Sequence, residues 1–201
     1  MYRFTVKHNI ERFQRLLHSE VESSQRKVLE ELLANAKREL SALEGIWSWT
    51  CPHLNISASL GDKAEKMLDH VVTYSGADYG SMQLWDSGDN CLRLIAQCNF
   101  DPSFTHQFAA VRKADGTVCE AAINAAETVV VEDLEATETF ASLRDWARKK
   151  NIRAIQSTPV FGQSGKLIGA FSTHYIRPHS CSPKDQELFA RCAAEMRSAF
   201  A

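Results

Sequence analysis

Residues 153–175, RAIQSTPVFGQSGKLIGAFSTHY, decide the fold of this chain. Two runs rich in β-branched and aromatic residues, 153–161 and 166–175, flank the polar and glycine residues GQSG at 162–165. Two extended runs joined by so short a polar loop predict a β-hairpin. The chain therefore contains at least one pair of long antiparallel strands.

A second hairpin is predicted upstream, where strands 79–86 and 91–98 flank the loop SGDN. Adjacent hairpins favour a largely antiparallel sheet. The other expected elements, in order, are a helix capped by Asp62 with Glu65 in its first turn, a short helix opening at Pro102, a helix at 118–126, a strand at 128–131, a helix at 140–150 and a closing helix capped by Ser182. This order predicts an α+β sandwich with terminal helices on one sheet face and room for a pocket on the other.

The first 45 residues have a different pattern from the rest. We expect a short helix capped by Asn9, then a second helix that starts at Ser23 or Ser24 and ends at Gly45. The second helix carries a heptad seam of about two repeats, formed by Leu29, Leu33, Ala36, Leu40 and Leu43. The seam fits either a hairpin that packs on its own chain or a dimerisation element. The expected organisation is a helical hairpin at 1–45, a connector at 46–61 and a domain at 62–201.

Composition places the chain among ordinary globular proteins. It has 201 residues, 44% hydrophobic and 24% charged, with 23 Lys and Arg against 25 Asp and Glu. This balance argues against a dedicated nucleic-acid partner, and the sequence has neither a membrane-spanning run nor a signal peptide. The six cysteines are scattered and form no CxxC motif, so we expect reduced thiols and a cytoplasmic location.

From about residue 62 to the end, the order of the motifs resembles a GAF domain. The motifs are ADYGSMQLWD (77–86), CLRLIAQCNFDPSF (91–104), DGTVCEAAINAAETVVVEDL (115–134), the hairpin at 153–175 and RPHSCSPKDQELFARCAAEM (177–196). The resemblance, to the stand-alone bacterial sensor type, implies a PAS-like antiparallel sheet of five to six strands flanked by helices. It also implies a ligand pocket, although such domains sense small molecules, bind chromophores or simply dimerise.

Strand alternation predicts which side chains face this pocket. We expect Met82, Leu84, Ile155 and Phe171 to face the terminal helices. The candidate ligand-binding residues are then Gln83, Trp85, Gln156, Thr158, Ser172 and His174, with Cys119 and, at the pocket rim, Asp133. Buried polar groups need partners. A small polar ligand or water would supply them, or these groups satisfy one another and nearby backbone without any ligand.

Cys119, in GTVCEAA, is the thiol of most interest. It lies near the start of a predicted helix, where partial positive charge can lower a thiol pKa. Its position resembles a cysteine of the GAF-fold free methionine-(R)-sulfoxide reductases, which need further cysteines on neighbouring loops. The matching stretches here, VRKADG and ARKKNIRAIQS, contain none. A packing cysteine is therefore favoured over a catalytic one.

No motif identifies a cofactor. His174, His179 and Cys181 lack the paired spacing of a structural zinc site, as does Cys51-Pro52-His53. We expect no metal, while haem ligation through His174 or His179 stays open. The cysteine–histidine pattern for bilin attachment and the motif of cyclic-nucleotide-binding GAF domains are both absent.

These features together favour a small-molecule-sensing or regulatory module in signal transduction. No output domain is recognisable in the sequence. We expect no enzymatic activity, an unidentified small-molecule ligand, a homodimer and a signalling partner such as a kinase or regulator. The alternatives are a thiol-based reductase centred on Cys119 and a purely structural dimerisation module.

Overall fold

The computed structural model describes residues 2–18, 22–50, 58–112 and 114–200. The chain divides into two compact units, residues 1–52 and 53–201. Each unit is described by itself below. No helix among these residues has the length and apolar character needed to cross a bilayer.

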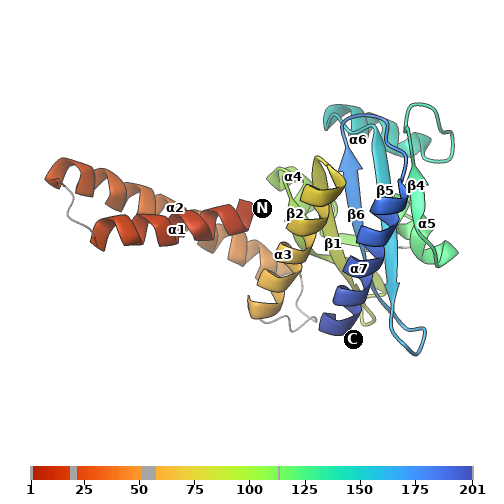
Figure 1. Cartoon of the computed structure of the whole chain (residues 1–201), viewed down its shortest axis with the longest axis horizontal. Helices are drawn as coiled ribbons and strands as arrows, with labels where there is room; N and C mark the ends of the chain where they lie inside the picture. The colour runs from red at the N-terminus through yellow and green to blue at the C-terminus, as the bar shows by residue number, and fades with distance from the viewer. Residues whose placement is uncertain (1, 19–21, 51–57, 113, 201) are drawn as a thin grey trace. The chain divides into compact units, whose positions relative to one another are not determined.

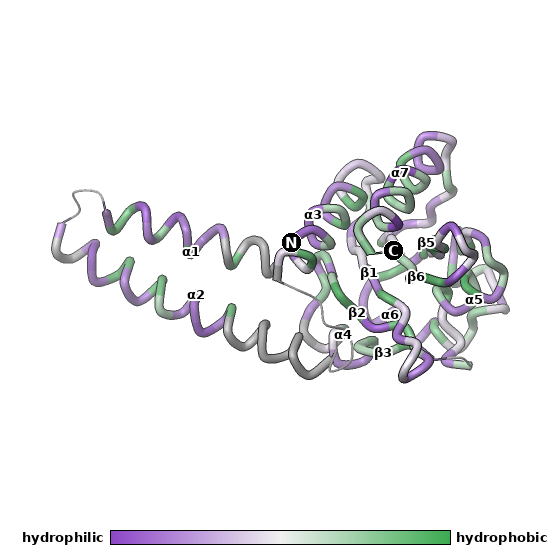
Figure 2. The backbone as a smooth tube through the Cα atoms, turned by 90° about the horizontal axis from the view of Figure 1, so that it is seen from below, coloured by the Kyte–Doolittle hydropathy of each residue, from purple (hydrophilic) through white to green (hydrophobic). Residues whose placement is uncertain are grey.

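The first unit is a helical hairpin of α1 (Tyr2–His18) packed against α2 (Ser23–Thr50) (Figure 1). Polar and apolar residues alternate along both helices (Figure 2). On α2 the predicted seam is the packed face, since Ala36 is buried and Leu33 half-buried, whereas Val28 and Leu32 are 56% and 42% exposed. Leu29 and Leu40 are also half-buried, and the side chain of Leu43 lies outside the described residues. The hairpin thus packs its seam internally.

The predicted start of the second helix at Ser23 is confirmed, but two other predicted helix boundaries in this unit were wrong. Asn9 lies inside α1, which begins seven residues earlier at Tyr2, and α2 continues through Gly45 to Thr50. One interior glycine costs only about 1 kcal/mol relative to alanine, which is too little to end a long helix. The helix therefore extends into the predicted connector at 46–61, of which 51–57 lie outside the described residues.

The second unit is built on a six-stranded antiparallel sheet of order β3-β2-β1-β6-β5-β4. The strands are β1 (Tyr79–Asp86), β2 (Cys91–Cys98), β3 (Ala110–Arg112), β4 (Val129–Val131), β5 (Ala154–Phe161) and β6 (Leu167–Tyr175). Both predicted hairpins and the α+β antiparallel class are confirmed. The sequence pattern missed β3, an edge strand of three residues.

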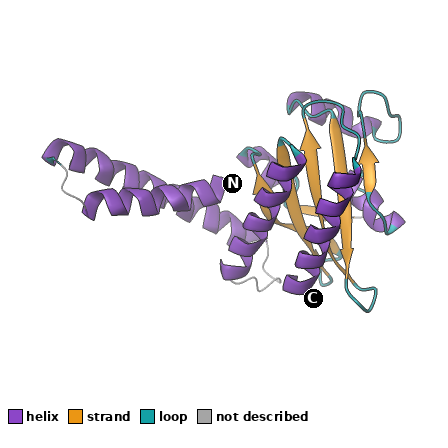
Figure 3. Ribbon diagram, viewed as in Figure 1, coloured by secondary structure: helices purple, strands orange, loops and turns teal. Residues whose placement is uncertain are grey.

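Two helices cover one face of the sheet. In Figures 1 and 3, α3 (Ala58–Ser75) and α7 (Pro183–Phe200) lie side by side in front of the strands. The predicted cap of α7 is confirmed, because the Asp185 N–H donates to Ser182 Oγ at 3.2 Å and the Ser182 N–H donates to Asp185 Oδ2 at 2.9 Å. The predicted cap of α3 was wrong, since Asp62 lies inside the helix.

Gly169 on β6 allows the sheet to pack tightly beneath α7. A Cβ at this position would lie 2.1 Å from the Gln83 carbonyl oxygen of β1 and 2.8 Å from the terminal carbon of Met196. Both distances are shorter than any real carbon contact, and one partner is backbone. A side chain here would force β1 and β6 apart.

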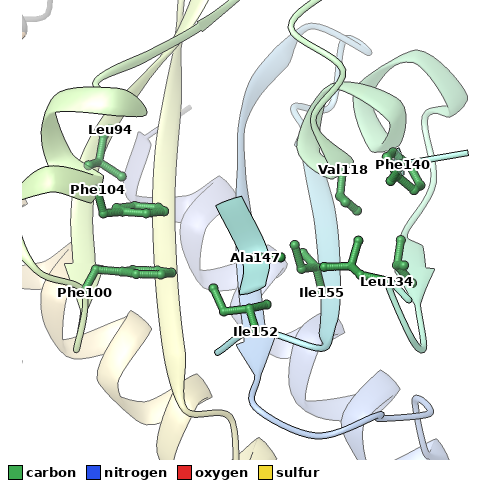
Figure 4. Packing of buried hydrophobic residues seen from close by; sticks show 10 residues of the cluster. Leu94, Phe100, Phe104, Val118, Leu134, Phe140, Ala147, Ile152 and Ile155 are labelled. Carbon is green, nitrogen blue, oxygen red and sulfur yellow. The ribbon is translucent and has the colours of Figure 1, made fainter. Parts of the chain in front are cut away.

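The opposite face of the sheet is covered by short elements. These are α4 (Pro102–Gln107), α5 (Val118–Ala125), the 3₁₀ turn η1 (Ala141–Leu143) and α6 (Arg144–Lys149). They enclose an apolar cluster that includes Phe104, Leu134 and Ile155 (Figure 4). In that view the rings of Phe100 and Phe104 are stacked one above the other, with centroids 3.6 Å apart.

Candidate functional site

A cavity of about 40 Å³ lies on this second face, between the sheet and the short elements that cover it. We call α4, α5, η1 and α6 the cap. The cavity wall is mixed: the sheet supplies mainly polar side chains and the cap mainly aromatic and aliphatic ones. The lining residues are Ser81, Gln83, Ile155, Ser157, Ser172 and His174 from β1, β5 and β6, with Phe104, Phe108, Val111, Thr117, Val118, Cys119, Leu143 and Trp146.

The central strands place the polar floor of the cavity. Ser172 of β6 lies opposite both Ser81 of β1 and Ser157 of β5, so the three hydroxyls share one face. The Ser157 and Ser172 hydroxyls are hydrogen-bonded at 2.5 Å, and both residues are buried. The Ser157 and Ser172 hydroxyls are therefore partnered without any ligand, which is the second of the two alternatives that the sequence left open.

Aromatic side chains form the roof. The ring of Phe108 lies 4.9 Å from that of Phe104 and meets Trp146 edge to face at 5.0 Å. Helix α4 is held at its start by Asp101, whose carboxylate accepts a hydrogen bond from the Ser103 N–H, and by Pro102 at the first helical position.

An ion pair joins the two helices that carry these rings. Lys150, which follows α6, donates to Asp101 Oδ2 at 2.5 Å and to Ser103 Oγ at 2.8 Å. The hydrogen bond from Lys150 holds the pKa of Asp101 at about 2, well below its usual value. Because both charges are partly exposed, this contact positions the roof more than it stabilises the fold.

His174 is a neutral imidazole in the floor. It is 5% exposed, and its ring donates to the Tyr79 carbonyl and meets Phe100 edge-on at 5.0 Å. Burial lowers the pKa of His174 to about 3, against the opposing effect of the hydrogen bond to Tyr79. Its Nδ1 atom has no hydrogen-bond partner among the described residues.

Cys119 lies in the cavity wall as a protonated thiol. Its Sγ is 3.2 Å from the Thr117 hydroxyl, and the residue is 9% exposed. The expectation that the helix start lowers its pKa was wrong. Burial raises the pKa of Cys119 and outweighs the lowering effect of the hydrogen bonds from Thr117 and the backbone. A thiol in this state is a poor nucleophile.

Four of the predicted ligand-binding residues line the cavity: Gln83, Cys119, Ser172 and His174. Trp85 lies on the same face but in a separate cleft of about 20 Å³, between β2 and α5. Asp133 is outside both, and its carboxylate accepts hydrogen bonds from the Arg153 guanidinium at 2.6 and 3.0 Å.

The predicted orientation of β5 was wrong. Thr158 lies opposite Phe171, whose ring contacts Phe189 of α7, so Thr158 and Gln156 face the terminal helices. Ile155, expected on that side, lines the cavity instead. Both faces of β5 are buried and each mixes polar with apolar residues, so alternation alone cannot distinguish them.

Several cavity residues were not among the sequence candidates. Ser157 could not have been found from the loop length, because Phe161 pairs with Leu167 and only a register shift between Val160 and Phe161 brings odd-numbered residues of β5 opposite even-numbered residues of β6. Ser157 then shares a face with Ser172. Phe104 and Trp146 lie in the short helices predicted at Pro102 and at 140–150, and nothing local in the sequence marks them as pocket residues.

No group of three His, Cys, Asp or Glu side chains in the described ranges is arranged to hold a metal ion. His174, which the sequence left open as a haem ligand, lies in the floor with its Nδ1 atom unpartnered among the described residues. The cavity holds only about three water-sized groups, so its volume is far smaller than that of a haem.

An antiparallel sheet with two helices on one face and a capped cavity on the other defines a PAS-like α+β domain. The family model described as GAF domain matches residues 57–201, well over half of the chain. The chain belongs to the GAF domain family.

Solved structures agree with this assignment at the level of the fold. The GAF domain of the Acinetobacter phosphoenolpyruvate-protein phosphotransferase is 18% identical, with a TM-score of 0.59 over 78% of this chain and 90% of that one. The corresponding Coxiella burnetii domain is 13% identical, with a TM-score of 0.61 over 77% and 90%. Free methionine-R-sulfoxide reductase from Neisseria meningitidis, solved with its substrate, is 18% identical, with a TM-score of 0.57 over 79% and 85%. No curated protein matches the chain.

Proposed function

We propose that this protein is a sensory or regulatory GAF module that binds a small molecule in the cavity between the sheet and the cap. The observation that carries the proposal is the buried Nδ1 atom of His174, which has no partner among the described residues and belongs to a residue lining a cavity roofed by aromatic side chains. Unpartnered buried polar atoms are rare in proteins and are expected where a ligand or water completes them.

The sheet offers a route from the cavity to the terminal helices. Ser172 lines the cavity, and the next residue back along β6, Phe171, contacts Phe189 of α7 on the other face. A ligand that shifts β6 by even a small distance would change the packing of α7, because closely packed interfaces rearrange rather than deform. A partner that contacts α7 could read this change.

The output is proposed to lie on another protein, such as a kinase or regulator, with the module acting as a cytoplasmic homodimer. Val28 and Leu32 lie one turn apart on α2, on a face that leaves both exposed, and would contribute to a dimer contact. Leu32→Glu leaves the internal seam of the hairpin intact. An unchanged solution mass in this variant would remove that face of α2 from dimerisation.

We propose no enzymatic activity. The reductase alternative needs a reactive thiol and a second thiol to resolve its sulfenic acid. Cys119 has a raised pKa, and no second cysteine is among the described residues that line the cavity. Measured turnover of free methionine-R-sulfoxide by the wild type, lost in Cys119→Ser, would reverse this assignment.

Native mass spectrometry of the freshly purified full chain tests the sensor proposal, combined with thermal-shift screening of small molecules. Ser157→Val replaces a floor hydroxyl by two methyl groups and so narrows the cavity and removes a polar group from it, while Trp85→Phe changes the neighbouring cleft and serves as the control. We expect a retained or added non-covalent ligand in the wild type and the control but not in Ser157→Val. If no ligand is found, or if every ligand of the wild type also binds Ser157→Val, the module is structural.

A further inference from the structure

The cavity wall carries no formal charge. No Lys, Arg, Asp or Glu is among its described lining residues, and its single histidine, His174, is neutral. Charged groups around the cap have partners: Lys150 and Asp101, which flank α6 and α4, are bonded to each other, and the Glu120 carboxylate of α5 accepts hydrogen bonds from the Ala114 and Gly116 N–H groups. A ligand that brought a net charge into this space would be desolvated without a counter-charge, which is strongly unfavourable.

Much of the polar surface in the wall is already satisfied. The Ser157 and Ser172 hydroxyls bond to each other, and Thr117 bonds to Cys119. These pairs present a weakly polar surface that does not call for a strongly polar ligand. Recognition therefore depends on whatever polar atoms remain without partners.

Two polar atoms of the described cavity wall are fully buried without a partner, one on each side, and the Gln83 amide and the Ser81 hydroxyl also line the cavity. Trp146 Nε1 belongs to the roof and His174 Nδ1 to the floor, and both are buried without a hydrogen-bond partner. The Phe104 ring lies between them, with its centroid 6.2 Å from that of Trp146 and 6.3 Å from that of His174. An indole N–H can only donate. The imidazole already donates to the Tyr79 carbonyl, so Nδ1 is an acceptor.

We infer that the cavity selects an uncharged, largely apolar small molecule that carries one acceptor for the Trp146 indole N–H and one donor for His174 Nδ1. This inference rests on the proposed sensor function and specifies its ligand class. A carboxamide or lactam group on an aromatic body has this chemistry. Nucleotides and zwitterionic amino acids do not, because each brings charges that the wall cannot pair.

Ring-sized ligands must also open the roof. The cavity volume of about 40 Å³ holds about three water-sized groups. An amide group fits that volume, but an aromatic body requires the rings of Phe108 and Trp146, which meet edge to face at 5.0 Å, to separate. Binding is therefore expected to move the cap.

Benzamide, benzoate and benzamidine test the inference, because they have nearly the same shape and carry no charge, a negative charge and a positive charge. The full-length wild type is titrated with each, following the indole N–H signals of its tryptophans by NMR. We expect benzamide to shift the Trp146 signal saturably. Benzoate and benzamidine should bind with an affinity at least about 100-fold lower. The shift is measured on the wild type and needs no variant to fold.

Two matched variants locate the site. Trp146→Phe keeps an aromatic ring but removes the indole N–H donor, and should weaken benzamide binding about threefold to tenfold. Trp85→Phe, in the separate cleft, should leave it unchanged. Equal or tighter binding of benzoate or benzamidine, or no response to benzamide, overturns the ligand class. The sensor proposal fails only if Ser157→Val abolishes the binding of no ligand at all, whatever its chemical class. Failure of the ligand class and failure of the sensor proposal are therefore distinguishable.

Discussion

Protonation of His174 should destabilise the fold in mildly acidic solution. The buried imidazole has a pKa of about 3 in the native state, against an ordinary value of 6.5. Between these two values the unfolded chain binds a proton that the native state does not. The free energy of unfolding therefore increases with pH across this range and is lost as pH falls below about 6.5.

The size of the effect follows from this shift in pKa. Each unit of pH in the window changes the unfolding free energy by up to about 1.4 kcal/mol for one group. From pH 7 to pH 5, His174 alone should remove about 2 kcal/mol, because its unfolded-state protonation only begins near pH 6.5. The group is buried on all sides, so solvent screening does not reduce this figure much.

Urea unfolding at pH 7, 6 and 5 measures this loss directly. His174→Gln removes the titrating group and keeps a donor for the Tyr79 carbonyl, and His106→Gln removes an exposed histidine of α4 as the control. The wild type and the control should lose about 2 kcal/mol more than His174→Gln over this range. Equal losses in all three proteins would refute the reasoning that His174 is held neutral by burial.

Three further predictions concern packing, the thiol and the cap. Gly169→Ala should destabilise the fold by more than about 3 kcal/mol in urea unfolding, since its new Cβ overlaps backbone and overpacking adds strain. Cys119 should react with iodoacetamide at pH 8 far more slowly than a small free thiol, and at a normal rate once unfolded; rapid native labelling, located by peptide mass, would contradict its burial. Asp101→Asn should cost less than about 1 kcal/mol, because asparagine still caps α4 and the lost ion pair with Lys150 is partly exposed; a larger loss in melting experiments would mean the pair stabilises the fold.

The positions of most elements in the second unit could be predicted locally. Turn residues between extended runs located both hairpins, and the cap at Ser182 located α7, because these signals act within a few residues. Signals that depend on context failed. Gly45 did not end α2, and β3 is a strand only because β2 provides a partner for three residues.

The candidate site was predicted in part, for a similar reason. Ser172 and His174 were placed correctly, whereas the orientation of β5 was reversed because its two faces differ little in polarity. Trp146 was missed because its role comes from the rings that surround it, which lie far away in the sequence.

By itself the sequence determined an antiparallel α+β domain with a helical hairpin before it, since periodicity and turn chemistry are local properties of the chain. Only the tertiary structure decided the chemistry of the cavity. The neutral state of His174 and the protonated thiol of Cys119 both result from burial, which a helix start or a neighbouring residue does not reveal. Burial is set by segments distant in sequence, so the uncharged state of this site arises only once the sheet and cap have packed together.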